Sequence, residues 1–149
     1  MKIFITFLFL ILNAATFSCE FVEHIDHITE ENYEKEEVEN VFRKAWDFLN
    51  TYKDRVDFDL AILKKIALEI ESISTNVTEK PSVRSQAYLY LSGIHAKMSD
   101  KLRSNGGIAE GKIAYKSVKA AMAMDATNKD AVNVFATIIY RMIQKNFIT

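Results

Sequence analysis

The sequence predicts an all-α protein of about five antiparallel helices, and three observations lead to this class. One proline and four glycines are spread over 149 residues, so helix-breaking positions are few. After residue 33, apolar residues recur at three- and four-residue steps, which is the period of a half-buried helix. The polar stretches between these periodic segments are short, and short connections favour antiparallel neighbours.

The first 18 residues have the pattern of a secretory signal peptide. Lys2 precedes an apolar run over residues 3–12, and small and polar residues follow. That run is shorter than the roughly 20 apolar residues needed to span a bilayer. We therefore expect residues 1–18 to direct export, residues 19–32 to form a linker and residues 33–149 to form one helical domain. A buried N-terminal helix is the alternative.

Cys19 is the only cysteine, so the chain has no internal disulfide. Its place behind the apolar run resembles the lipid-acceptor cysteine of bacterial lipoproteins, and lipidation would anchor the protein to a membrane. Thr16 departs from that pattern, because such signals usually carry leucine there. Ordinary cleavage beside Ser18 is the competing interpretation. We expect an exported protein that is periplasmic, secreted or membrane-anchored.

Two helices are expected before Pro81. The first covers about residues 33–52, and glutamates crowd its first turns, where negative charge suits the positive end of the helix dipole. The second covers about residues 58–74. The residues expected to face inward are Val38, Val41, Phe42, Ala45, Trp46, Leu49 and Tyr52 in the first helix, and Leu60, Leu63, Ile66, Ala67, Ile70 and Ile73 in the second.

Three further helices are expected over about residues 82–102, 108–124 and 129–146. Pro81 suits a first helical turn, where its missing N–H costs nothing. Asn128 is a good N-cap for the last helix. The expected inward residues are Ala87, Tyr88, Leu91, His95, Met98 and Leu102, then Ala114, Tyr115, Val118, Ala121 and Met122, then Val132, Phe135, Ala136, Ile139, Met142 and Ile143.

The stretch "SNGGIAEGK" matches most of a phosphate-binding loop through Gly106, Gly111 and Lys112. Such a loop needs a strand before it and a Ser or Thr after its lysine, whereas here a helix precedes and Ile113 follows. We therefore interpret the stretch as a turn between helices. Gly106 and its neighbour Gly107 would supply the backbone angles of a helix end, and Gly111 would let helices approach.

The remaining chemical candidates are weak. His24, Asp26 and His27 could ligate a metal, but they fall in the expected linker without a fourth ligand. His95 is interpreted as a core histidine, and Asn76 opens a three-residue glycosylation pattern. A net charge of −1 argues against a nucleic-acid partner. No constellation of nucleophile, base and orienting group is evident, so we expect neither an enzyme nor a cofactor.

An internal similarity narrows the fold. "AYLYLSGIHAKMSD" at residues 87–100 aligns without gaps to "AVNVFATIIYRMIQ" at residues 131–144, with a shared order of large and small residues. "DATN" at residues 125–128 closes the stretch between them. This pattern resembles the tetratricopeptide (TPR) repeat. Its spacing of 44 residues departs from the usual 34 or so, and Ser92 stands where that repeat usually has glycine.

The resemblance implies stacked helical hairpins with a last capping helix; an ordinary five-helix bundle is the alternative. It implies an exported scaffold whose concave face binds a protein or peptide partner in the cell envelope. The alternative function is a small-ligand component, as in periplasmic TPR proteins associated with tripartite transporters. The residues that the resemblance places on the concave face are Gln86, Tyr90, Lys97, Asn133, Thr137, Tyr140 and Arg141.

Overall fold

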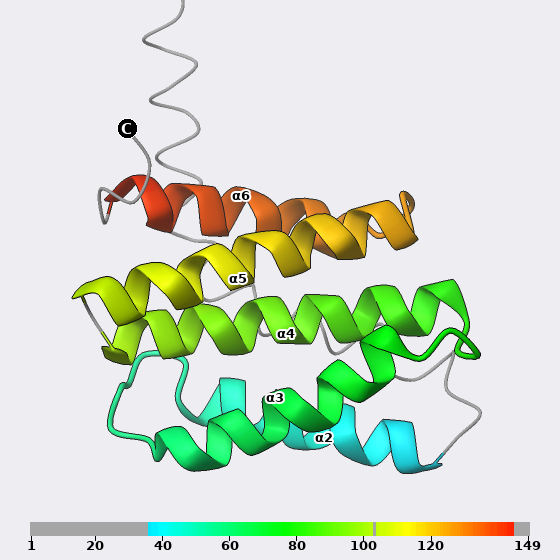
Figure 1. The fold of residues 1–149 in the computed structure, drawn as a ribbon, viewed down its shortest axis with the longest axis horizontal. Helices are drawn as coiled ribbons and strands as arrows, with labels where there is room; N and C mark the ends of the chain where they lie inside the picture. The colour runs from blue at the N-terminus through cyan, green and yellow to red at the C-terminus, as the bar shows by residue number, and fades with distance from the viewer. Residues whose placement is uncertain (1–35, 103, 145–149) are drawn as a thin grey trace, which may run out of the picture.

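The structure, a computed structural model, describes residues 36–102 and 104–144. All regular structure within those two ranges is helical, which confirms the predicted all-α class. The helices begin and end near their predicted positions, except that the fourth begins earlier than expected (Figure 1). They are α2 (Glu36–Thr51), α3 (Leu60–Thr75), α4 (Pro81–Leu102), α5 (Ser104–Met124) and α6 (Lys129–Gln144).

The predicted N-terminal features lie outside the described residues. These are the signal peptide over residues 1–18 and the linker over residues 19–32. They stay predictions from the sequence, together with the residues they contain that were singled out for chemistry: Cys19, His24, Asp26 and His27.

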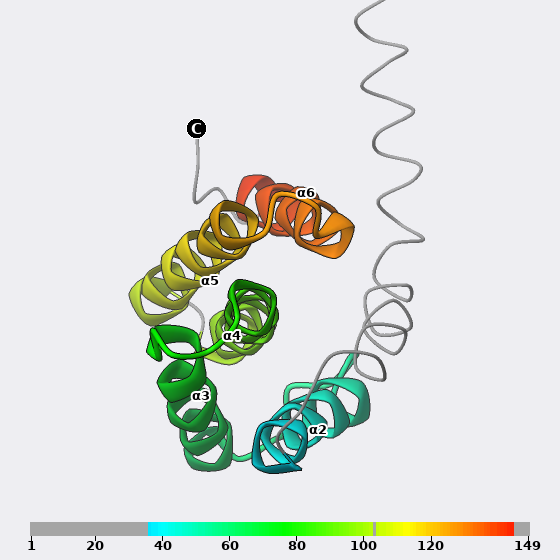
Figure 2. The same ribbon diagram turned by 90° about the vertical axis from the view of Figure 1, so that its right-hand side faces the viewer.

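The five helices of the described ranges lie in two curved layers. Figure 2 shows α2, α4 and α6 on one side and α3 and α5 on the other, with α4 in the middle. Each helix packs on its neighbours in the chain, and α4 also packs on α2 and α6. This arrangement is compatible with a helical-repeat fold. It also buries α4 on nearly all sides, whereas the sequence predicted a helix with one inward stripe.

Two apolar clusters form the core and meet at α4. The larger joins α2, α3 and one side of α4 around Phe42, Leu63 and Ile94, and the smaller joins α5, α6 and α4 around Leu89 and Val118. Full burial of one such side chain stabilises the fold by about 1.5–3 kcal/mol. The inward residues predicted for the first two helices all lie in or against the larger cluster, which confirms both stripes.

Side-chain caps fix the starts of α3 and α6. Asp59 accepts a hydrogen bond from Ala61 N at 2.8 Å at the start of α3. Asn128 accepts one from Ala131 N at 3.1 Å at the start of α6, as predicted. The Asn128 amide also donates to Ser85 Oγ at 3.0 Å, which ties the α5–α6 turn to α4. Pro81 is the first residue of α4, also as predicted.

The glycine stretch is helical, so the predicted turn is wrong. α5 begins at Ser104, and Ser104 itself adopts the left-handed backbone angle, with φ of 44°. No described glycine has a positive φ. Gly107 is instead required by a close approach of α5 to α4, because a Cβ there would lie 2.8 Å from the Ser99 carbonyl oxygen. Gly111 is buried in α5, and Lys112 is exposed beside it.

α6 is rotated about its axis relative to the prediction. Val132 and Ile143, expected inward, are 51% and 52% exposed. The helix carries apolar residues on two sides, so periodicity alone did not define which side faces the core. The cap at Asn128 and the contact of Arg141 with Asp100 on α4 are consistent with the observed rotation. The residues that α6 buries are Asp130, Ala131, Val134, Ile138 and Met142.

Candidate functional site

The candidate site is the face shared by α2, α4 and α6, which we call the inner face. α4 supplies its floor, because residues spaced by three or four positions share one side of a helix. α2 and α6 supply its walls. The floor consists of Gln86, Tyr90, Gly93 and Lys97, the α2 wall of Phe42 and Trp46, and the α6 wall of Asn133, Thr137, Tyr140 and Arg141.

The floor is buried, which corrects the expectation that Gln86, Tyr90 and Lys97 would face a ligand across an open surface. Their exposed fractions are 1%, 0% and 7%. The Tyr90 ring stacks on Phe42 of α2 with ring centroids 5.1 Å apart. These positions are buried because α4 is packed against helices on several sides, whereas the sequence pattern assumed one solvent-facing stripe.

Lys97 has a structural role at the end of α2. Its ammonium group donates to the backbone carbonyls of Tyr52 and Lys53. The last turn of α2 carries no basic residue of its own. The Lys97 ammonium from α4 therefore supplies the positive charge that stabilises the negative end of the α2 dipole. Burial lowers the pKa of Lys97 below its usual 10.5, with Asp100 acting against that shift. Lys101, one turn further along α4, donates to the Val56 carbonyl in the loop between α2 and α3 at 3.0 Å.

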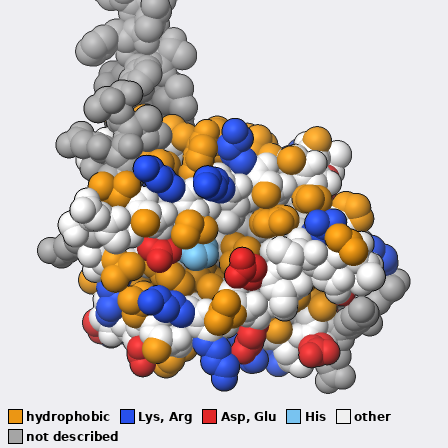
Figure 3. Space-filling model, viewed as in Figure 1, with side chains coloured by type: hydrophobic (Ala, Val, Ile, Leu, Met, Phe, Trp, Pro, Cys, Tyr) orange, Lys and Arg blue, Asp and Glu red, His pale blue; other side chains and the backbone are white. Residues whose placement is uncertain are grey.

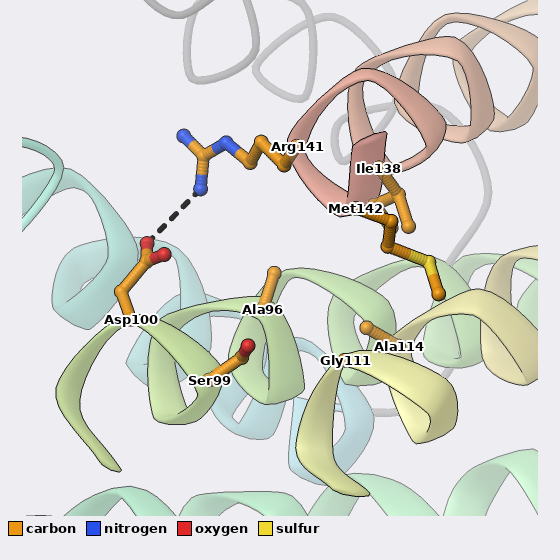
Figure 4. Close-up of a pocket in the computed structure, with 8 residues that line it drawn as sticks. All are labelled: Ala96, Ser99, Asp100, Gly111, Ala114, Ile138, Arg141 and Met142. Carbon is orange, nitrogen blue, oxygen red and sulfur yellow. Dashed lines mark hydrogen bonds and ion pairs between the residues drawn. The ribbon is translucent and has the colours of Figure 1, made fainter. Parts of the chain in front are cut away.

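The four predicted residues of α6 lie together. Asn133, Thr137, Tyr140 and Arg141 are all partly exposed and share one stripe. Arg141 Nη1 lies 3.1 Å from Asp100 Oδ2, which directs this stripe toward α4 (Figure 4). The Tyr140 hydroxyl accepts a hydrogen bond from Gln144 at 2.7 Å. The structure therefore brings the α6 half of the predicted site to an accessible edge and places the α4 half beneath it.

A small cavity lies beside the Asp100–Arg141 pair. Its volume is about 20 Å³, and Ser99, Gly111 and Met142 are among the residues around it (Figure 4). A volume of this size holds about one water molecule. A metabolite cannot enter this cavity unless the helices separate.

The sequence predicted that His95 is a core histidine. It is instead partly exposed and forms a pair with Glu110 where α4 contacts α5. Its Nδ1 lies 2.6 Å from Glu110 Oε2, and the two side chains are 16% and 17% exposed. By helical position His95 lies on the side of α4 opposite Gln86 and Lys97, so the pair is separate from the inner face. Spacing along the chain could not reveal Glu110, because it belongs to the next helix.

A second hollow lies between α2 and α3. It is an open groove of about 610 Å³ with polar walls that include Asn40, Lys44 and Glu69. Lys44 and Glu69 form an ion pair at 3.0 Å across it. Asn76, at one end, accepts hydrogen bonds from the Thr78 amide and hydroxyl, so the glycosylation pattern forms a tight turn.

Charges are mixed over the surface. In Figure 3, basic, acidic and apolar side chains are interspersed across the described helices on the face that is shown. Nowhere in the described ranges do three or more His, Cys, Asp or Glu side chains gather as metal ligands do. Within the same ranges, every helix is too short or too polar to cross a bilayer.

Comparison with known proteins adds no relative. No protein-family profile, curated protein or solved structure matches this chain.

Proposed function

We propose that this protein is an exported, TPR-like helical-repeat scaffold that binds a protein or peptide partner along the α6 edge of its inner face. The observation that carries the proposal is the row of Asn133, Thr137, Tyr140 and Arg141, all partly exposed on one stripe. Tyrosine and arginine dominate the energetics of many protein interfaces. The amide and hydroxyl groups in the same row add donors and acceptors for a polypeptide.

The shape of the site supports a polypeptide more than a metabolite. Sites for small molecules usually enclose about 300–1,000 Å³. The cavity beside Arg141 measures about 20 Å³, whereas the α6 stripe is partly exposed over about two turns. A peptide or a partner helix can contact such a stripe without a deep pocket. The open groove between α2 and α3, of about 610 Å³, falls within that range of volumes, so a small-ligand component stays the alternative function.

The proposed location in the cell envelope is supported by the N-terminal sequence pattern. Lys2 and the apolar run over residues 3–12 are typical of export signals, and Cys19 would be available for lipid once such a signal is removed. Mass spectrometry of the protein from its native host tests this part. The expected product lacks residues 1–18, and a product that retains them would contradict export by cleavage.

A photocrosslinking amino acid placed at Tyr140 tests the binding edge in living cells. The matched control carries the same group at Lys116, which is exposed on α5 away from the inner face. We expect one dominant protein adduct from position 140 that is absent from position 116. No adduct at position 140, or equal adducts at both positions, would contradict the proposed binding edge.

A further inference from the structure

The side of α6 that faces away from the core carries an apolar stripe, which we call the outer stripe. It consists of Val132, Ala136, Ile139 and Ile143, which recur at four-, three- and four-residue steps and therefore share one side of the helix. Val132 and Ile143 are 51% and 52% exposed. α6 lies at one end of the array and, among the described helices, packs only on α4 and α5 (Figure 2). The outer stripe is therefore open to a partner.

No other described helix has two large, exposed apolar residues on one side. α3 exposes Ile62 and Leu68, but these are six positions apart and point about 120° away from each other. Leu102 of α4 and Ile113 of α5 are the single ones of their helices. Scattered exposed apolar residues are normal, whereas a contiguous apolar stripe indicates an interaction site.

The order of residues in the outer stripe is self-complementary. Val132 and Ile143 are centred on the point between positions 137 and 138 of the helix. Ala136 and Ile139 are centred on the same point. In an antiparallel pair of helices, a two-fold axis through that point sets the two members of each pair opposite each other. Ala136 then faces an isoleucine, so the helices can approach while the larger side chain fills the space.

We propose that two copies of this chain associate through α6, with their outer stripes antiparallel about a two-fold axis. The stripe is about 16 Å long, so it covers less than the roughly 800 Å² that each partner contributes to a stable interface. The dimer is therefore weak, with a Kd on the order of 10–100 µM. The row proposed to bind a partner lies about a third of a turn away on α6, and the dimer does not rest on that proposal.

Charge favours the antiparallel pairing. Of the three charged residues of α6, Asp130 is buried and Arg141 is paired with Asp100, which leaves Lys129 exposed at the start of the helix. In the antiparallel pair the two Lys129 positions are about 25 Å apart along the helix axis, well beyond the roughly 8–10 Å over which charges interact at physiological salt. A parallel pair would place them side by side.

The opposite end of the array does not match the outer stripe. There α2 exposes Glu39, Arg43 and Asp47 on one side. Stacking α6 of one copy on α2 of the next would bury these charged groups against apolar side chains, which is unfavourable for an unpaired charge. The stripe therefore fits a second outer stripe better than it fits α2, and this favours a closed dimer over a filament of copies.

Sedimentation of the full chain tests the dimer. The unmodified chain should change from monomer to dimer between about 1 µM and about 1 mM. Val132→Lys with Ile143→Lys sets like charges opposite each other in the proposed pair and should raise the Kd at least about tenfold. The matched control is Ile62→Lys with Leu68→Lys, which adds the same charge to residues of α3 that are 53% and 67% exposed. It should leave the Kd unchanged.

Disulfide formation tests the register. In a Cys19→Ser background, which removes the only native thiol, a mixture of Val132→Cys chains and Ile143→Cys chains should form a linked heterodimer. Each variant alone should not, because identical positions would lie about 16 Å apart and a disulfide needs Cα atoms within about 7 Å.

Four results would overturn the proposal. A chain that stays monomeric at about 1 mM would do so, as would equal effects of the two double lysine variants. Links that form as well in one cysteine variant as in the mixture would contradict the antiparallel register. A monomeric purified chain whose outer stripe crosslinks to a different protein in cells would assign the stripe to that protein instead.

Discussion

Two adjacent glycines of α5 should respond to alanine in opposite directions. At Gly107 a Cβ would lie 2.8 Å from the Ser99 carbonyl oxygen, a backbone atom that can move only if α4 and α5 move apart. At Gly106 the nearest atom is Leu102 Cβ at 3.6 Å, which is an ordinary contact. The same methyl group is therefore forced into the helix–helix seam at one position and accommodated at the other.

The expected magnitudes follow from these distances. Overpacking a tight seam typically costs about 1–3 kcal/mol, and replacing a helical glycine by alanine returns up to about 1 kcal/mol. Gly107→Ala should lower the free energy of unfolding by about 1–2 kcal/mol, whereas Gly106→Ala should raise it by about 0.5–1 kcal/mol. The two variants should therefore differ by about 2 kcal/mol.

Urea unfolding followed by far-UV circular dichroism measures this difference. With a typical slope of about 1–3 kcal/mol per molar urea, the midpoints of the two variants should differ by about 1 M, with Gly107→Ala lower. The slopes should agree, because both variants expose the same surface. A Gly107→Ala variant as stable as Gly106→Ala would refute the close approach of α5 to Ser99.

Three further predictions concern stability. Lys97→Met removes the donor to the end of α2 and should cost about 1–3 kcal/mol in urea unfolding, whereas Lys116→Met on the exposed side of α5 should change stability by less than about 0.5 kcal/mol. Burial lowers the pKa of Lys97 in the folded chain, so between that lowered pKa and 10.5 the unfolded chain binds more protons than the folded chain. The free energy of unfolding of the unmodified chain should therefore rise relative to that of Lys97→Met as the pH rises through this window. A difference between the two chains that stays flat or falls would contradict this prediction. Asn128→Ala removes the N-cap of α6 and should lower the free energy of unfolding by about 1 kcal/mol. A urea midpoint equal to that of the unmodified chain would contradict this prediction.

Much of the helical framework could be predicted from the sequence. Apolar periodicity located each of the five described helices, and Pro81 and Asn128 marked two of their starts. These signals are local, since a cap or a first-turn proline acts within its own helix. The inward stripes of α2 and α3 were also predicted correctly, because each of those helices has a single apolar side.

What depends on a neighbouring helix could not be predicted in the same way. α6 has two apolar sides, and its contact with α4 identifies the one that faces the core. The glycine stretch was predicted to be a turn. The structure shows that Gly107 is needed because the Ser99 carbonyl of another helix lies close to it, and spacing along the chain does not reveal that contact. Lys97 was predicted to bind a ligand. Its actual hydrogen-bond acceptors, two backbone carbonyls, lie more than 40 residues earlier in the sequence, so the pattern around Lys97 could not reveal them.

The α6 residues of the predicted site are more accessible than those of α4. Tyr140 and Arg141 lie on α6, the last helix of the described part, and no further described helix packs beyond it, so they remain partly exposed. Gln86 and Tyr90 lie on the central helix and are buried. Whether a predicted site residue is accessible therefore depends on where its helix lies among the others, and the sequence pattern does not reveal that position.

The most direct test of the proposed function is the affinity of the partner captured at Tyr140 for the double variant Tyr140→Ala with Arg141→Ala. The Asp100–Arg141 pair is about one-third exposed on the arginine side, and exposed pairs contribute about 0–1 kcal/mol, so the variant should keep its helical signal and melt within a few degrees of the unmodified chain. Binding should weaken at least about tenfold, which is about 1.4 kcal/mol. Full affinity in a folded double variant would contradict the account, because the α6 edge would then play no part in recognition.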